Sequence, residues 1–239
     1  MKYVQDRTGR FAQRPHFEPE ELDYECEEVV SSFLRAKYGS VMYPITTNDL
    51  TILIERHVSE LDVYPDLTEE GGDIQGVTEF VSGKKPKVRI AKELSEQEGR
   101  ENRLRTTLTH ELGHVKFHNF LWDERVKQLS LSLEEGARTT PKCKREDIFE
   151  AGTTDWTEWQ AGCAYGAFLM PVSKVKQIVL NFFRTNESYA PLERASVHAD
   201  KLIEHVSTAF LVSAEAATVR LSKLGFIGNQ VPQSPLLPF

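Results

Sequence analysis

The residues best suited to chemistry are two histidines and a glutamate in the segment THELGH, residues 109–114. Residues four apart lie one above the other on a helix, so His110 and His114 share a face and both reach a single ion. Glu111 is rotated by about 100° from His110, which puts its carboxylate beside that ion. Zn²⁺ held by two histidines and a carboxylate lowers the pKa of water, and a neighbouring carboxylate takes the proton as hydroxide attacks a carbonyl. The spacing therefore predicts a zinc metallopeptidase with His110 and His114 as metal ligands and Glu111 as the catalytic base.

A five-residue pattern of this kind also arises by chance on ordinary amphipathic helices. Here Leu104, Leu108, Leu112 and Val115 form an apolar stripe beside the histidine face. Such a stripe buries the helix and directs the histidines into a cleft, which favours the metal site over a chance match.

His118 continues the series of histidines four residues apart, but the geometry excludes it as the third ligand. Eight helical residues rise about 12 Å, whereas a zinc to nitrogen bond is about 2.0 Å long. The longer motif, in which a glycine turns the chain before a third histidine, is absent as well. We therefore interpret His118 as a packing residue or as a residue that supports a ligand.

A third ligand has to come from another part of the chain, and the best source is a second helix that begins near residue 155. A glutamate on that helix would complete a site of two histidines and one carboxylate. The residue pattern alone leaves four candidates open, which are Glu158, Asp155, Glu150 and Asp147.

The elements that must position these residues follow from apolar spacing, caps and turn residues. Ser95 and Glu98 form a capping-box pattern, which predicts the start of the long helix that carries the histidines. The whole pattern predicts helices over residues 17–38, 47–56, 95–120, 155–170, 173–183, 191–212 and 214–224, and strands over 61–64, 76–81 and 87–90. Residues 121–157 are polar and broken by glycine and proline, so an irregular loop is expected there, and the tail 229–239 is expected to be extended.

Composition restricts the class of protein. With 239 residues, 40% apolar and 27% charged, the chain is typical of a globular protein and large enough for a buried site. The N-terminus lacks the apolar core of a secretory signal, and we expect a cytoplasmic protein. Its three cysteines, Cys26, Cys143 and Cys163, are far apart and are expected to be reduced thiols. A net charge of −7 disfavours direct nucleic-acid binding.

From about Thr47 to Phe226 the sequence resembles the ImmA/IrrE family of metallopeptidases. THELGHVKFH stands where that family has its zinc helix, EWQAGCAYGAFLMP looks like its second motif, and AFLVSAEAATVRLSKLGFI resembles the end of its helical region. The resemblance implies that His110, His114 and Glu158 are the zinc ligands and that Glu111 is the base.

Two features depart from that family. Gly162 stands where the family often has asparagine, so a hydrogen bond that orients a ligand is missing or comes from another residue. The stretch between His114 and Glu158 is also longer than the family leads one to expect. We therefore expect an inserted loop, about residues 121–157, that overhangs the cleft.

The fold expected is α+β: a zincin-like domain, residues 1–171, with a small and mainly antiparallel sheet and a zinc-binding helix pair, and then a helical region, residues 172–239. The sequence leaves open whether that region is a separate domain. The resemblance further implies a metallo-endopeptidase that cleaves or binds a helix-turn-helix repressor or antitoxin. Strand 76–81, if it lies at a sheet edge, could align the substrate by adding it to the sheet. His198 and His205 are available to stabilise an oxyanion, but a structural role is more common for such residues.

Two other functions compete with proteolysis. The chain could bind and sequester a repressor without cutting it, and zinc would then serve stability or sensing. Residues 212–225 could alternatively form a helix-turn-helix, with Ser213 at a helix start and Arg220 reading DNA. Because this segment has few basic residues and the whole chain is acidic, packing of these helices on the zinc domain is the better interpretation.

Overall fold

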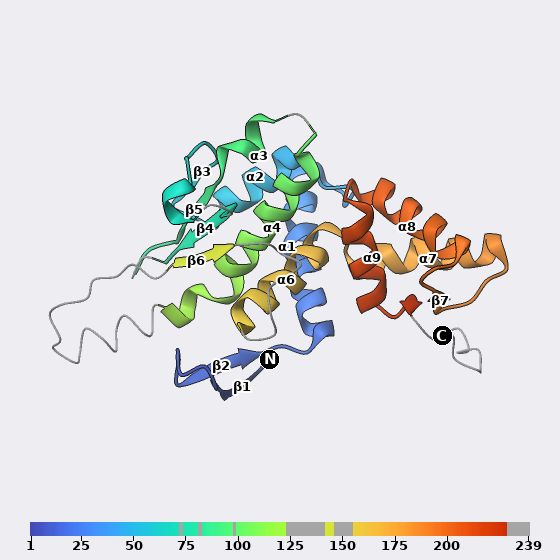
Figure 1. Cartoon of the computed structure of the whole chain (residues 1–239), viewed down its shortest axis with the longest axis horizontal. Helices are drawn as coiled ribbons and strands as arrows, with labels where there is room; N and C mark the ends of the chain where they lie inside the picture. The colour runs from blue at the N-terminus through green and yellow to red at the C-terminus, as the bar shows by residue number, and fades with distance from the viewer. Residues whose placement is uncertain (72–73, 81–82, 98, 123–141, 146–154, 229–239) are drawn as a thin grey trace, which may run out of the picture. The chain divides into compact units, whose positions relative to one another are not determined.

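The computed structural model describes residues 1–71, 74–80, 83–97, 99–122, 142–145 and 155–228, and it has a mixed α+β fold (Figure 1). The helices are α1 (Pro19–Tyr38), α2 (Thr47–Glu55), α3 (Lys92–Glu96), α4 (Glu101–Phe117), α6 (Trp156–Leu169), α7 (Val172–Asn186), α8 (Val197–Phe210) and α9 (Ala214–Lys223). The strands are β1 (Lys2–Gln5), β2 (Gln13–His16), β3 (Glu60–Asp62), β4 (Gly76–Glu79), β5 (Lys87–Ile90), β6 (Lys142–Arg145), β7 (Leu192–Glu193) and β8 (Ile227–Gly228). The predicted α+β class and the helical C-terminal region are confirmed.

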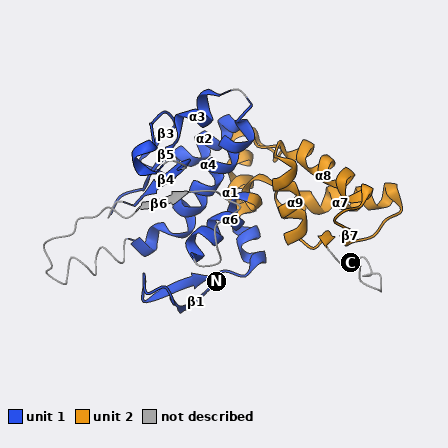
Figure 2. Cartoon of the chain, in the orientation of Figure 1, with its two compact units in different colours: residues 1–25, 46–165 blue, residues 26–45, 166–239 orange. Residues whose placement is uncertain are grey.

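The chain divides into two compact units, coloured separately in Figure 2. The first comprises residues 1–25 and 46–165, and the second comprises residues 26–45 and 166–239. Strands β1 to β6 and helices α2, α3 and α4 belong to the first unit, whereas α7 to α9 belong to the second. The domain boundary expected after residue 171 stays a prediction.

A four-stranded sheet forms one wall of the first unit, in the order β3-β5-β4-β6. β3 runs parallel to β5, while β4 is antiparallel to both of its neighbours, so the sheet is mainly antiparallel. The strand predicted at 76–81 is therefore not an edge strand, because β6 pairs with its outer side and places Cys143 opposite Thr78. Sequence patterns missed β6, which lies inside the region expected to be an irregular loop.

Helix α4 is the central element of the first unit and contacts α2, α3, β4 and β5. Every residue from Thr107 to Val115 is buried, so its polar side chains must find partners within the protein. Thr107 and Thr109 donate their hydroxyl groups to carbonyl oxygens of their own helix, at Arg103 and Arg105. The polar atoms of His110, His114 and Glu111 instead lie close to residues of α6 and β4.

The predicted start of this helix was wrong. Ser95 belongs to the separate short helix α3 and donates its hydroxyl to the carbonyls of Val63 and Lys92, so it does not cap α4. Gly99 has a φ of +87°, a backbone conformation that interrupts a right-handed helix between α3 and α4. Glu98, the other half of the expected capping box, lies outside the described residues.

In the second unit, serine caps begin two of the helices. Ser196 and Ser213 accept hydrogen bonds from the backbone N–H groups of Ala199 and Ala216, at the starts of α8 and α9. Arg220 of α9 is buried and donates from Nε to the carbonyl oxygen of Met170, so it is not presented for reading DNA. Among the described residues, no helix is both long and apolar enough to cross a membrane.

Helix α6 packs closely against α4 at a glycine. A Cβ atom on Gly113 would lie 3.1 Å from Ala161 Cα and 3.2 Å from Ala164 Cβ, so this position of α4 has no room for a larger residue. Small residues on both helices therefore allow the close approach that brings the two predicted ligand helices together.

We predict that Gly113→Val lowers the free energy of unfolding by about 1–3 kcal/mol, because the added methyl groups push against the α6 backbone. Urea denaturation followed by circular dichroism measures the change. Gly162→Val is the matched control, since a Cβ at this helical glycine meets nothing within 4 Å. If both variants lose the same stability, close packing at Gly113 is not what limits this position.

Candidate metal centre

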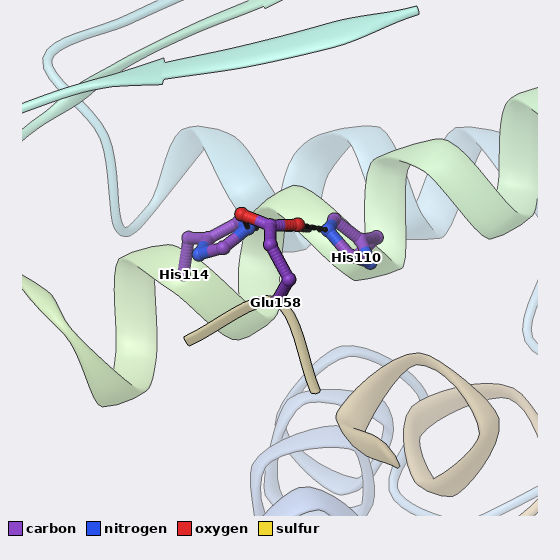
Figure 3. A group of neighbouring side chains, drawn as sticks. All are labelled: His110, His114 and Glu158. Atoms are coloured by element: carbon purple, nitrogen blue, oxygen red, sulfur yellow. Dashed lines mark hydrogen bonds and ion pairs between the residues drawn. The ribbon is translucent and has the colours of Figure 1, made fainter. Parts of the chain in front are cut away.

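Three side chains from α4 and α6 turn toward a common point, as Figure 3 shows. His110 Nε2 lies 3.0 Å from Glu158 Oε2 and 3.1 Å from His114 Nε2. His114 Nε2 lies 3.2 Å from Glu158 Oε1. Both histidines are buried, and the side chain of Glu158 is 18% exposed. The structure thus brings together the three residues that the sequence and the resemblance nominated as ligands.

The chemistry of these atoms fits a bound cation. Imidazole nitrogens with lone pairs and carboxylate oxygens are all acceptors, and acceptors at this separation repel one another unless positive charge lies among them. In a tetrahedral zinc centre with bonds of about 2.0–2.1 Å, ligand atoms are separated by about 3.3 Å, close to the distances between these atoms. Two histidines and one glutamate also leave the fourth position of such a centre open.

Electrostatics keeps Glu158 in its charged form. Burial alone raises the pKa of its carboxyl group, but attraction to His114 and hydrogen bonds with both histidines lower that pKa well below its usual range. A carboxylate is the form that binds a metal, so Glu158 is ready to act as a ligand without losing a proton.

The nearest rival for the third position has another role. Asp155 forms an ion pair with Arg10, at 2.7 Å, and accepts hydrogen bonds from the backbone and side chain of Thr157. Burial raises the pKa of Asp155, yet these hydrogen bonds bring the net pKa below its usual value. Asp155 therefore anchors the N-terminal segment to the start of α6. The other two rivals, Asp147 and Glu150, lie outside the described residues.

Strand β4 positions the carboxylate of Glu111. Thr78 donates its hydroxyl to Glu111 Oε2 at 2.6 Å, and both residues are fully buried. A Cβ atom on Gly76 would collide with Glu111 Oε1, so the carboxylate fills the space that a side chain there would occupy. No sequence pattern indicated Thr78, because its proximity to Glu111 depends on how β4 packs against α4.

His118 is a fully buried residue that contacts His114 on the side away from Glu158 and His110. Its Nδ1 is 3.0 Å from Nδ1 of His114, and its Nε2 is 3.0 Å from Oε1 of Gln160. Burial, followed by repulsion from His114, lowers the pKa of His118 to about 3. His118 is thus in contact with a candidate ligand, as one of the two sequence interpretations expected. Sequence analysis missed Gln160, although the stacking of three histidines was a signal that a partner for the last one was needed.

The histidines considered for oxyanion stabilisation belong to the second compact unit. His198 and His205 are exposed residues of α8, and the ring of His205 contacts that of Phe182 edge to face, with centroids 5.5 Å apart. The candidate metal centre belongs to the first unit. A role for either histidine in catalysis remains a prediction.

No model of a known protein family matches the chain, and no curated protein matches it. Membership in the ImmA/IrrE family therefore rests on the motifs described above and remains a proposal.

We predict about one zinc ion per chain, measured by elemental analysis of protein purified without added metal. His114→Ala should abolish tight binding, and Glu158→Ala should weaken it strongly, because each change removes a ligand atom. Asp155→Ala removes the rival carboxylate, which faces Arg10, and should weaken zinc binding less than Glu158→Ala does. A larger loss of zinc from Asp155→Ala than from Glu158→Ala would show that the third ligand was chosen wrongly.

Proposed function

We propose that the chain is a zinc-dependent metallo-endopeptidase that hydrolyses peptide bonds in the cytoplasm. The observation that carries this proposal is the convergence of His110 Nε2, His114 Nε2 and the Glu158 carboxylate within 3.2 Å. A buried carboxylate, Glu111, follows His110 directly on the same helix and is held by a separate strand. Two ligands and the base on one rigid helix, with the third ligand on a neighbouring helix, are an arrangement that suits metal-assisted hydrolysis of a peptide.

In the proposed mechanism, His110, His114 and Glu158 hold the zinc ion. Bound zinc supplies Lewis acidity, which lowers the pKa of water and polarises a carbonyl group. Glu111 acts as general base: its carboxylate accepts a proton from the attacking water and later gives that proton to the amine that leaves. Thr78 fixes the orientation of Glu111 by donating its hydroxyl to Oε2 of the carboxylate.

The resemblance to the ImmA/IrrE family supports a protein substrate, specifically a helix-turn-helix repressor or antitoxin. The acidic balance of the chain, with a net charge of −7, is compatible with a basic protein of that kind. A substrate that adds to β4 as a strand would have to replace β6, because β5 and β6 already pair with both sides of β4.

The pairing of β4 with both β5 and β6 also favours a second candidate function, which is sequestration of the regulator. If β6 stays in place, β4 cannot align an extended peptide, and the chain would bind and sequester the regulator without cutting it. The zinc ion would then stabilise the first unit rather than act on a peptide bond.

We predict that Glu111→Gln keeps bound zinc but hydrolyses peptide bonds about 100- to 10,000-fold more slowly, since it loses the general base. The parent and the variant, both loaded with zinc, are incubated with a lysate of the source organism, and new protein N-termini are identified by mass spectrometry. Cleavage by the parent alone, within a helix-turn-helix regulator, is the expected result.

The same regulator, purified, should remain whole and bound to Glu111→Gln. Zinc content is measured beside cleavage, so that loss of the metal is not mistaken for loss of the base. If the variant relieves repression in cells as well as the parent does, catalysis is not the function, and sequestration replaces it.

We further predict that Thr78→Val lowers kcat on the identified substrate by about 10-fold or more, because a hydrogen bond to a charged group contributes about 1.5–3 kcal/mol. Valine keeps the shape of threonine but has no hydroxyl group. Thr78→Ser is the matched variant and should restore the rate. Zinc affinity should be unchanged in both, and equal rates in Thr78→Val and the parent would contradict the positioning role of Thr78.

A further inference from the structure

A continuous chain of hydrogen bonds leads from His114 to the backbone of strand β2. His114 Nδ1 lies 3.0 Å from His118 Nδ1, and His118 Nε2 lies 3.0 Å from Gln160 Oε1. Gln160 Nε2 donates to the carbonyl oxygen of Pro15 at 2.9 Å. His114, His118 and Gln160 are all at most 1% exposed, so water does not compete for these bonds.

The carbonyl at the end of this chain determines the direction of every bond in it. A carbonyl oxygen only accepts, so the amide NH₂ group of Gln160 faces Pro15 and its oxygen faces His118. His118 Nε2 must then donate, and a neutral imidazole that donates from one nitrogen accepts at the other. His118 Nδ1 therefore accepts from His114 Nδ1.

At the candidate metal centre, this direction of the hydrogen bonds determines which nitrogen of His114 carries the lone pair. When His114 is neutral and its proton is on Nδ1, the lone pair is on Nε2, which is the atom that faces His110 and Glu158. The opposite tautomer would place a proton on Nε2 and block metal binding there. A hydrogen bond from the other ring nitrogen also fixes the ring and raises the basicity of a ligating histidine.

We propose that His118 and Gln160 are positioning residues, which hold His114 in its metal-binding tautomer through a hydrogen-bond chain that ends on the carbonyl of Pro15. The inference rests on the proposed metal site but not on peptide hydrolysis. It also gives the N-terminal hairpin β1–β2 a role, because β2 supplies the fixed acceptor. Arg10, in the same hairpin, binds Asp155 and Thr157 at the start of α6 and so holds β2 beside Gln160.

Substitutions at Gln160 separate a positioning role from a packing role. Gln160→Met keeps the length of the side chain but removes both polar groups, so His118 loses its acceptor. Gln160→Glu keeps an oxygen that accepts from His118, whether or not the carboxyl is protonated, and in its protonated form it also donates to Pro15. Simple packing favours methionine over glutamate at a buried position, whereas the hydrogen-bond chain requires the reverse.

Zinc affinity, measured by competition with a chelating dye, should fall about 10- to 100-fold in Gln160→Met and should stay near the parent value in Gln160→Glu. His118→Phe keeps the ring against Trp156 and should lose affinity as Gln160→Met does. Val115→Ala, a buried change on α4 outside the chain of hydrogen bonds, controls for loss of stability. Unchanged affinity in Gln160→Met, or a larger loss in Gln160→Glu, would overturn the proposal.

A second measurement needs neither a variant nor a metal. Nitrogen-15 NMR of the histidine rings in the metal-free parent should show His114 protonated on Nδ1 and His118 protonated on Nε2. The opposite tautomers would overturn the proposal even if every variant failed to fold. If the parent binds no zinc but shows these tautomers, the hydrogen-bond chain is supported and the proposed metal function fails separately.

Discussion

The convergence of two imidazoles and a carboxylate is the constraint on which the rest of the first unit depends. These groups lie within 3.2 Å of one another, in a site from which water is largely excluded. Burying them together requires positive charge among them, from a proton or a cation, and rigid elements that hold them in place. Gly113 provides the second condition, because the absence of a side chain there lets α6 bring Glu158 up to α4.

Burying α4 creates a second requirement, since each of its polar side chains must have a partner. Thr107 and Thr109 have partners within the helix, because their hydroxyl groups donate to carbonyl oxygens of α4 itself. The side chains of the candidate site have partners on three other elements. Glu111 accepts from Thr78 on β4, and His110 and His114 contact Glu158 on α6. His114 also connects, through His118 and Gln160, to the carbonyl of Pro15 on β2. Strand β4, helix α6 and strand β2 therefore each contribute to the site.

The local part of this site could be predicted from the sequence. The spacing of His110 and His114 fixes their common face, because helix geometry depends on near neighbours alone. Glu158 is distant along the chain, and residue types alone could not separate it from Asp155. Thr78 had no signal, and the histidine series indicated only that His118 needs a partner, because tertiary packing decides which residue supplies it. The start of α4 was also misjudged, since α3 ends at Glu96 and Gly99 has a positive φ, at a point where the capping pattern favoured a continuous helix.

Strand β6 links the predicted inserted loop to the position of Glu111. It pairs with β4 so that Cys143 is opposite Thr78, the residue that donates to Glu111. Pairing on both sides holds β4 more firmly than an edge position would, which favours a fixed orientation for the Glu111 carboxylate. The same pairing uses the backbone groups that an added peptide strand would need. Strand β4 therefore cannot pair with β6, which holds Thr78 in place beside Glu111, and at the same time pair with a substrate strand on that side.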